Sequence, residues 1–275
     1  MAPTIPFFVL STCFLALPFF SMVSRSFTDE KTGAFTFDNY ILCFTKNSYI
    51  ITLTNSLRIS FYAVIIAMII AFFVAMAVHS TGITTRKWFM PIMNMSQNFA
   101  GFPIAFAFVL MIGKQGFIRL ALEYAGVTAL KDFNLLTYNG VIPIYVWFGI
   151  PLGGLLLLPG FEAVRNEWKE ASVLLGCSSV GFWFRIGIPN LLPTILGTLS
   201  IVFADSITTY TTAYILFGGT ALLLPIRIAN MFSGDLKASE EVGCALSVIL
   251  ILIILIVMIL CNLGKRIITK RGVSA

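Results

Sequence analysis

The sequence predicts an all-α, polytopic membrane protein with six transmembrane helices. Of its 275 residues, 58% are hydrophobic and only 11% are charged, and the mean hydropathy is +0.94. This composition lies far outside the range of soluble globular domains. A spanning helix needs about 20 mostly apolar residues, and the chain carries six segments of that kind. We therefore expect a single transmembrane domain over residues 1–275.

Six apolar segments are the expected spans. They cover residues 5–24, 54–78, 90–112, 140–160, 191–218 and 243–263. The first lacks the basic start and the small-residue cleavage site of a signal peptide, so we interpret it as a span. Pro6 and Pro18 within it predict a distorted helix. The sixth is an unbroken apolar run, and a basic tail typical of a cytoplasmic end follows it: Lys265, Arg266, Lys270 and Arg271.

The orientation follows from the basic tail and the even number of spans. With the C-terminus inside, the N-terminus is also inside, and the inner loops are 79–89, 161–190 and 264–275. The inner and outer sides each hold nine Lys and Arg residues, but the inner loops are shorter and therefore denser in positive charge. We expect both termini in the cytoplasm.

Charge and motifs exclude several classes of function. The net charge is +6, but the basic residues are scattered through short loops, so no nucleic-acid partner is expected. The five cysteines form no CxxC pair, and the single histidine, His79, lies where an apolar run ends, so no metal site is expected. No GxxxxGK[ST], HExxH or Gly-x-Ser-x-Gly motif occurs. We therefore expect no enzymatic activity, and uphill transport would need a partner or an ion gradient.

The largest polar segment on the expected cytoplasmic side is the loop 161–190. Residues 163–175 have helical propensity, with an apolar stripe at i, i+4, i+7 and i+11 formed by Val164, Trp168, Ala171 and Leu175. Gly176 follows and can take the left-handed conformation that ends a helix. A second amphipathic stretch covers residues 178–186. The pattern predicts a helical hairpin at the membrane face, suited to a partner's groove.

Within this loop, the motif resembles the EAA loop of binding-protein-dependent ABC importer permeases. That motif is Glu-Ala-Ala, three residues, Gly, nine residues, then Ile-x-Leu-Pro. Here it is Glu170-Ala171-Ser172, then Gly176, then Ile186-Gly187-Ile188-Pro189. All spacings are kept, with Ser in place of the second Ala and Ile in place of Leu. The resemblance extends over most of the chain, and the loop precedes the penultimate of six spans, as in that family.

The resemblance implies a type I ABC importer permease fold in the bacterial inner membrane. It implies two cytoplasmic ATP-binding subunits, a second permease (homologous or identical) and an extracytoplasmic solute-binding protein. ATP and Mg²⁺ would bind the ATPase, and this chain would need no cofactor. The EAA loop would dock in a groove of the ATPase, with Glu170 able to pair with a basic residue there. The residues implied in docking are Glu170, Ala171, Ser172, Gly176, Ile186 and Pro189. Without a partner, the segment would be an amphipathic hairpin on the membrane surface.

Polar residues inside the spans are candidates for the translocation path. A carboxylate in a span costs roughly 2.5–3.5 kcal/mol, so Asp205 should face protein or water. Three threonines share its helical face, at i+3, i+4 and i+7: Thr208, Thr209 and Thr212. Asp205 either lines the path or forms an interhelical hydrogen bond, and span threonines commonly serve packing. In the third span, Asn94 and Asn98 either line the same path or bond a neighbouring helix.

The resemblance also narrows the solute. Sugar permeases often carry Asp-Gly in the middle of the EAA motif, whereas Leu175-Gly176 is more similar to permeases for polyamines, ferric iron, thiamine, phosphonates or sulfate. In polyamine-type permeases an acid often precedes an aromatic residue; here Thr209 stands before Tyr210, and Asp205 lies one turn earlier. We expect a small cation such as spermidine or putrescine, moved by alternating access. A gradient-driven secondary transporter or channel is the alternative from another class.

Overall fold

The computed structural model describes residues 9–81, 83–99, 101–127, 133–220, 223–233 and 240–273. Regular structure in these ranges is helical, with an isolated bridge between Thr28 and Phe35. Six helical segments are long and apolar enough to cross a membrane: Val9–Ser26, Asn47–Thr81, Phe102–Tyr124, Tyr138–Ala163, Ser179–Phe217 and Glu240–Ile268. The all-α fold with six spans is therefore confirmed. Residues 5–8 of the first expected span lie outside the described residues.

The chain divides into two compact units. One combines Met1–Ser56 with Phe217–Ile253, and the other combines Leu57–Leu216 with Ile254–Ala275. Two long helices, α4 (Asn47–Thr81) and α14 (Glu240–Val273), contribute residues to both. A single transmembrane domain over the whole chain stays a prediction.

The first unit is held together by an apolar core between short helices. It contains η2 (Thr12–Ala16), α2 (Leu17–Ser26), α3 (Asp38–Thr45), α13 (Leu224–Phe232) and the first parts of α4 and α14. Its buried core comprises Cys43, Tyr49, Leu224, Met231, Val242, Ala245, Leu246 and Ile249. The Ser56 hydroxyl accepts a hydrogen bond from the Leu224 N–H at 2.7 Å, which satisfies a donor at the start of α13.

The expected distortion of the first span is present at Pro18. This residue lies in the first turn of α2, and the preceding turn, η2, is π-helical. Because proline has no N–H, it cannot close the normal helical bond four residues back. Pro6 lies outside the described residues.

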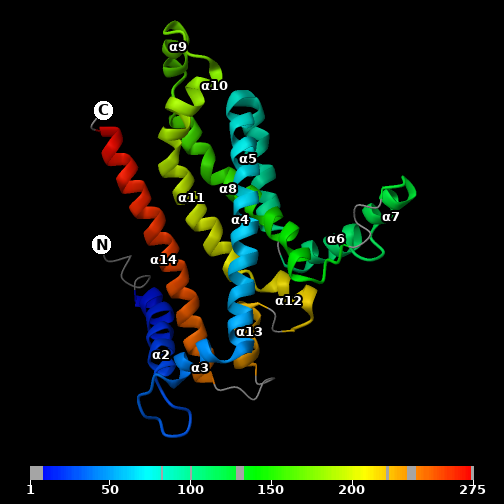
Figure 1. The fold of residues 1–275 in the computed structure, drawn as a ribbon, viewed down its shortest axis with the longest axis vertical. Coiled ribbons are helices and arrows are strands. Elements are labelled where there is room, and N and C mark those ends of the chain that lie inside the picture. The colour runs from blue at the N-terminus through cyan, green and yellow to red at the C-terminus, as the bar shows by residue number, and fades with distance from the viewer. Residues whose placement is uncertain are drawn as a thin grey trace. The chain divides into compact units, whose positions relative to one another are not determined.

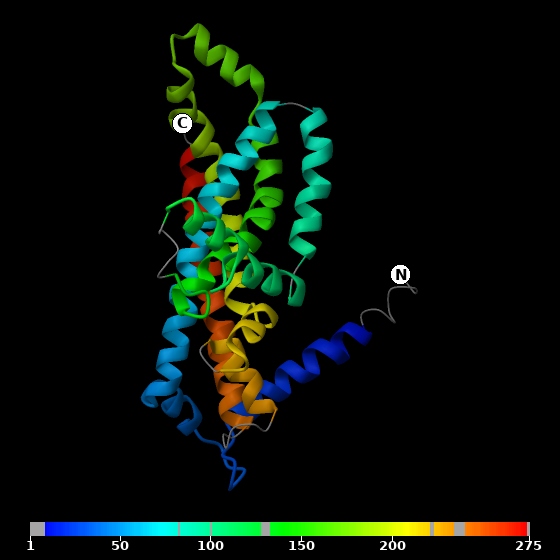
Figure 2. The same ribbon diagram turned by 90° about the vertical axis from the view of Figure 1, so that its right-hand side faces the viewer.

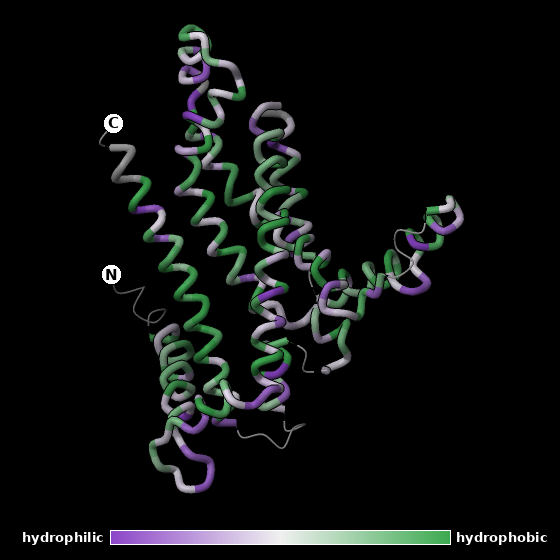
Figure 3. The backbone as a smooth tube through the Cα atoms, viewed as in Figure 1, coloured by the Kyte–Doolittle hydropathy of each residue, from purple (hydrophilic) through white to green (hydrophobic). Residues whose placement is uncertain are grey.

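The second unit contains the helices that position the candidate site (Figure 1). α8 (Tyr138–Ala163) packs against α5 (Ile83–Asn98) and against α11 (Ile188–Thr208). It also approaches α4 closely, because a Cβ at Gly149 would lie 2.6 Å from the Ala67 Cβ. Small residues at a helix contact allow such close backbone approach in membranes. Apolar residues run along most of α8 and α11, and hydrophilic residues gather around α9 (Asn166–Leu174) (Figure 3).

Two of the predicted spans are interrupted, which corrects their expected boundaries. The span 90–112 is divided between α5 and α6 (Phe102–Ile112), because Gly101 has a φ of 75° and Pro103 lies in the first turn of the new helix. α6 turns away from the direction of α5 (Figures 1 and 2). The span 191–218 is interrupted at Thr209, whose ψ is 110°, and continues as α12 (Thr211–Phe217). The continuous helical face expected from Asp205 onward therefore does not exist.

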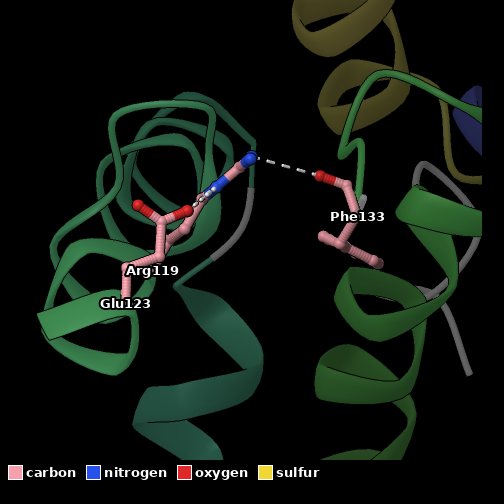
Figure 4. A network of polar contacts seen from close by, with 3 residues as sticks. All are labelled: Arg119, Glu123 and Phe133. Atoms are coloured by element: carbon pink, nitrogen blue, oxygen red, sulfur yellow. Dashed lines mark hydrogen bonds and ion pairs between the residues drawn. The ribbon is translucent and has the colours of Figure 1, made fainter. Parts of the chain in front are cut away.

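α6 leads into α7 (Phe117–Tyr124), a short helix tied to the chain that returns toward α8. The Arg119 Nε lies 3.3 Å from Glu123 Oε1. The Arg119 Nη1 also donates to the Phe133 carbonyl at 3.5 Å, so one guanidinium links both segments (Figure 4).

Candidate functional site

A cavity of about 270 Å³ lies where the two interrupted spans meet. The two interruptions are in contact, because a Cβ at Gly101 would lie 3.4 Å from Thr211 Cγ2. The second interruption contributes residues from both of its sides, the first contributes the end of α5 and Gly101, and α8 adds an aromatic ring. The lining residues are Gln97, Asn98, Gly101, Phe148, Asp205, Thr209, Tyr210, Thr211 and Thr212.

The end of α11 is stabilised by hydrogen bonds that replace the missing helical ones. The Thr208 hydroxyl donates to the Ala204 carbonyl and the Thr209 hydroxyl to the Asp205 carbonyl, each at 2.8 Å. The buried Tyr145 of α8 donates its hydroxyl to the Thr209 carbonyl at 3.2 Å. A carbonyl released from a helix needs such a partner when water is excluded. The interruption is therefore built into the packing of α8 against α11.

Asp205 carries the charge of the cavity. No cation or hydrogen-bond donor among the described residues contacts its carboxylate, and the described lining contains no Lys, Arg or His. The other polar groups are the neutral amides of Gln97 and Asn98 and several hydroxyls. Tyr210 adds an aromatic face and packs against Tyr214 in a tilted arrangement, with ring centroids 5.3 Å apart. This lining can receive a cation that also donates hydrogen bonds.

The structure brings together four of the expected path residues: Asn98, Asp205, Thr209 and Thr212 line the cavity. Thr208 and Asn94 are not in the lining, and the Asn94 amide donates to the Met90 carbonyl at 2.9 Å on its own helix. The transport roles of all six stay predictions. Four further lining side chains were not among the candidates. Gln97, Tyr210 and Thr211 stand beside candidates in the sequence, but Phe148 has no such signal, since it comes from a different helix.

The polar loop forms a helical hairpin at one end of α8 and α11 (Figure 1). α9 is followed by Gly176 with a φ of 78° and by α10 (Ser179–Phe182). The Gly176 N–H donates to the Val173 carbonyl and the Cys177 N–H to the Ser172 carbonyl, each at 2.9 Å. These are the bonds of a Schellman helix end. The helix begins at Asn166 rather than 163, because α8 continues to Ala163.

The tip of the hairpin exposes apolar side chains. Leu174 and Leu175 are each 88% exposed. A hollow beside them is lined by Lys169, Glu170, Val173 and Leu174. Ser172, in contrast, is buried, and its hydroxyl donates to the Lys169 carbonyl at 2.7 Å. Exposed apolar side chains beside charged groups are features expected of an interaction surface.

The remaining motif residues lie around the two ends of the hairpin. Ala171 is exposed on α9, Ile186 is half-buried, and Pro189 is exposed in the first turn of α11. The described part of the hairpin thus matches the predicted helix–turn–helix, while the docking roles of these residues stay predictions.

A comparison with protein families decides what kind of protein this is. Residues 67–271 match the family described as "Binding-protein-dependent transport system inner membrane component". The chain belongs to this family. The matched range contains both the cavity and the hairpin. The protein is therefore a multi-pass permease component of a type I ABC importer, as its EAA motif indicated.

Individual relatives of this permease differ in the solute that they are named for. The "Spermidine/putrescine transport system permease protein PotC homolog" of Mycoplasma pneumoniae is 26% identical over 277 residues, which covers 94% of this chain and 89% of the relative. The "Ferric transport system permease protein FbpB" of Actinobacillus pleuropneumoniae is 23% identical over 256 residues, but the aligned part spans only 35% of that protein.

A solved structure supports the permease fold. It is the crystal structure of a bacterial ABC transporter involved in the import of the acidic polysaccharide alginate. The TM-score is 0.76 at 17% identity, with 98% of this chain and 95% of that chain covered. At this identity, the similarity concerns the fold.

Proposed function

We propose that this permease imports a small organic cation, with spermidine and putrescine as the best candidates. The observation that carries the proposal is the Asp205 carboxylate, which lies in a cavity whose described lining has no cationic side chain. An ammonium group would form a charge-assisted hydrogen bond with this carboxylate. It would also gain from the aromatic faces of Phe148 and Tyr210. The relative named for spermidine and putrescine transport agrees with this choice.

The same lining ranks the alternative solutes. Phosphonate and sulfate are oxyanions, and they would meet the negative charge of Asp205 without a compensating cation among the described lining residues. Ferric iron prefers several oxygen ligands, and Asp205 is a single carboxylate. Thiamine has both a positive charge and aromatic rings, so the pairing of Asp205 with Phe148 and Tyr210 makes it the second candidate.

We further propose that energy enters through the hairpin. The exposed Leu174 and Leu175 and the neighbouring Glu170 are suited to a groove on a cytoplasmic ATPase. Docking there places the hairpin, and with six spans both termini, in the cytoplasm. Two ATP-binding subunits would bind ATP and Mg²⁺, while a second permease and an extracytoplasmic binding protein complete the importer. This chain would then perform no chemistry and need no cofactor.

In the resulting cycle, ATP binding closes the ATPase subunits and moves the hairpins with them. The translocation path between the two permeases, which the Asp205 cavity would line, then opens outward to receive the solute, and hydrolysis returns it to the inward-open state. Such alternating access requires that the hairpin and the cavity move together.

The solute is tested by uptake in cells that carry or lack the gene for this chain. We expect loss of the gene to abolish uptake of radiolabelled spermidine or putrescine. Unlabelled polyamine should compete better than thiamine, sulfate or ferric citrate. If uptake of another solute depends on the gene and no polyamine uptake occurs, the proposal that the solute is a polyamine is wrong.

The coupling partner is tested separately by purifying the tagged full-length chain from its membrane. We expect an ATP-hydrolysing subunit to co-purify and Glu170→Arg to remove it. Glu30→Arg, the same charge change at an exposed loop residue, should retain it. Transport by the chain without any ATPase would instead identify a gradient-driven transporter.

A further inference from the structure

The base of the hairpin is the place where helices that line the cavity converge. α5 carries Asn98 at its cavity end and Arg86 near its other end. α8 carries Phe148 at the cavity and Phe161 near the hairpin. α11 carries Asp205 near its cavity end and begins directly after the hairpin. At 1.5 Å per residue, the cavity and the hairpin base lie about 18 Å apart along α5.

We infer that Phe161, Trp183 and the Arg86–Glu162 ion pair form a mechanical joint that transmits hairpin movement to the cavity. This inference rests on the proposed role of the hairpin as the ATPase contact. These residues act on the solute only through the helices that they hold, so they are positioning residues.

Phe161 is the centre of the joint. It is 0% exposed. Its ring centroid lies 5.8 Å from Trp183 of the hairpin, 5.2 Å from Phe72 of α4 and 6.1 Å from His79. Because packed interiors are dense and barely compressible, displacement of one ring displaces its neighbours. A movement of Trp183 is therefore passed to α8 and α4.

The hairpin joins α11 through a π-helical turn, η3 (Trp183–Gly187). The Ile188 N–H donates to the Trp183 carbonyl, five residues back. Pro189, which follows, has no N–H to complete a normal helical bond. The indole ring of Trp183 packs directly against Gly187 of this turn, because a Cβ at Gly187 would lie only 2.4 Å from Trp183 Cε3. Such π turns often occur at functional positions within helices.

The Arg86–Glu162 ion pair connects α5, which also lines the cavity, to the end of α8 that carries Phe161. Arg86 Nη2 lies 2.6 Å from Glu162 Oε1, which links the first turn of α5 to the last turn of α8. The two side chains are 47% and 34% exposed. A pair this exposed contributes little to the free energy of unfolding. Its removal should therefore alter how α5 follows the hairpin and leave the fold intact.

The test measures movement at both ends in the full-length chain within its native complex. Cys13 and Cys177, which are exposed and half-exposed, are first replaced by Ser. A single reporter cysteine is then placed in the cavity (Asn98→Cys) or at an exposed hairpin position outside the proposed docking surface (Val180→Cys). Its modification rate by a charged maleimide is followed in membrane vesicles with and without ATP plus vanadate. With an intact joint, we expect ATP to change the rate at both positions.

Variants of the joint should uncouple the two reporters. In Arg86→Glu or Glu162→Arg, we expect the ATP-induced change at the cavity reporter to fall about threefold to tenfold. The hairpin reporter should keep its change. The double variant Arg86→Glu/Glu162→Arg should restore the response of the cavity reporter. Gly187→Ala, which displaces Trp183, should reduce that response. Lys87→Glu, the same charge change at an exposed neighbour on α5, is the matched control, and its cavity reporter should keep the full ATP-induced change.

Any of three results would show that the proposed joint is wrong. The cavity reporter could lose its ATP-induced change equally in Lys87→Glu, or fail to regain it in the double charge swap. It could also keep its full change in both Arg86→Glu and Gly187→Ala. A failure of the proposed coupling has a different signature. In that case ATP leaves the hairpin reporter unchanged even when the joint is intact, and the joint fails with it.

Discussion

The hairpin and the cavity are joined by the same helices, but they are built in opposite ways. The hairpin is one continuous stretch whose shape follows from neighbouring residues, above all the positive φ of Gly176 and the hydroxyl of Ser178, which caps α10. The cavity collects residues between Gln97 and Thr212 from both interrupted spans and α8. Changes in the hairpin should therefore affect energy coupling, and changes in the cavity should affect the solute.

The largest expected effect concerns the hairpin turn. In Gly176→Pro, the ring cannot adopt the φ of 78°, and the N–H that bonds the Val173 carbonyl is lost. We expect complete loss of ATPase co-purification with the tagged chain. Gly126 ends α7 with the same φ of 78° and an equivalent pair of hydrogen bonds, so Gly126→Pro is the matched control. Equal loss in both variants would show that the effect is general misfolding.

The second effect concerns the cavity charge. Asp205→Asn keeps the shape but removes the negative charge, and charge-assisted hydrogen bonds contribute about 1.5–3 kcal/mol. We expect the KM of polyamine uptake to rise at least roughly tenfold, with ATPase co-purification unchanged. Thr208→Val tests whether the cavity or the predicted helical face binds the solute, because Thr208 belongs to that face but is outside the described lining. A loss of uptake in Thr208→Val comparable to that in Asp205→Asn would contradict the importance of the cavity.

A smaller effect is expected where α8 supports the interruption of α11. Tyr145→Phe removes the hydroxyl that bonds the Thr209 carbonyl at 3.2 Å. Leaving this part-buried carbonyl without its partner costs about 1 kcal/mol, so we expect the KM of uptake to rise about fivefold. Tyr40→Phe, which removes a hydroxyl near Ser26 in the other unit, should leave the KM unchanged.

The smallest effect is expected at the departure from the EAA motif. Ser172 is buried, and its hydroxyl bonds a carbonyl of its own helix. Ser172→Ala removes this local bond but has the higher helix propensity, by a few tenths of a kcal/mol. Uptake and ATPase co-purification should both stay within about twofold of the wild-type values. A large change in co-purification would show that the Ser172 hydroxyl contacts the partner directly.

The two predicted spans that proved wrong in their boundaries show where hydropathy alone fails. Residues 90–112 and 191–218 are predominantly apolar, so they were expected as continuous helices. The first interruption had a local signal in Gly101 and Pro103, because glycine permits a positive φ and proline begins helices. The second, at Thr209 and Tyr210, has no helix-breaking residue, and its stabilising partner Tyr145 is 64 residues away.

The sequence by itself determined the membrane class, the six spans, the helical hairpin and the permease family. A bilayer offers no hydrogen bonds to the backbone, so long apolar segments must be helical, and a left-handed glycine ends a helix through bonds to its own neighbours. Only the tertiary structure decided the interruption at Thr209 and which polar residues meet around Asp205. Those features depend on contacts between separate helices, such as Tyr145 with Thr209 and Gly101 with Thr211, and no local spacing encodes them.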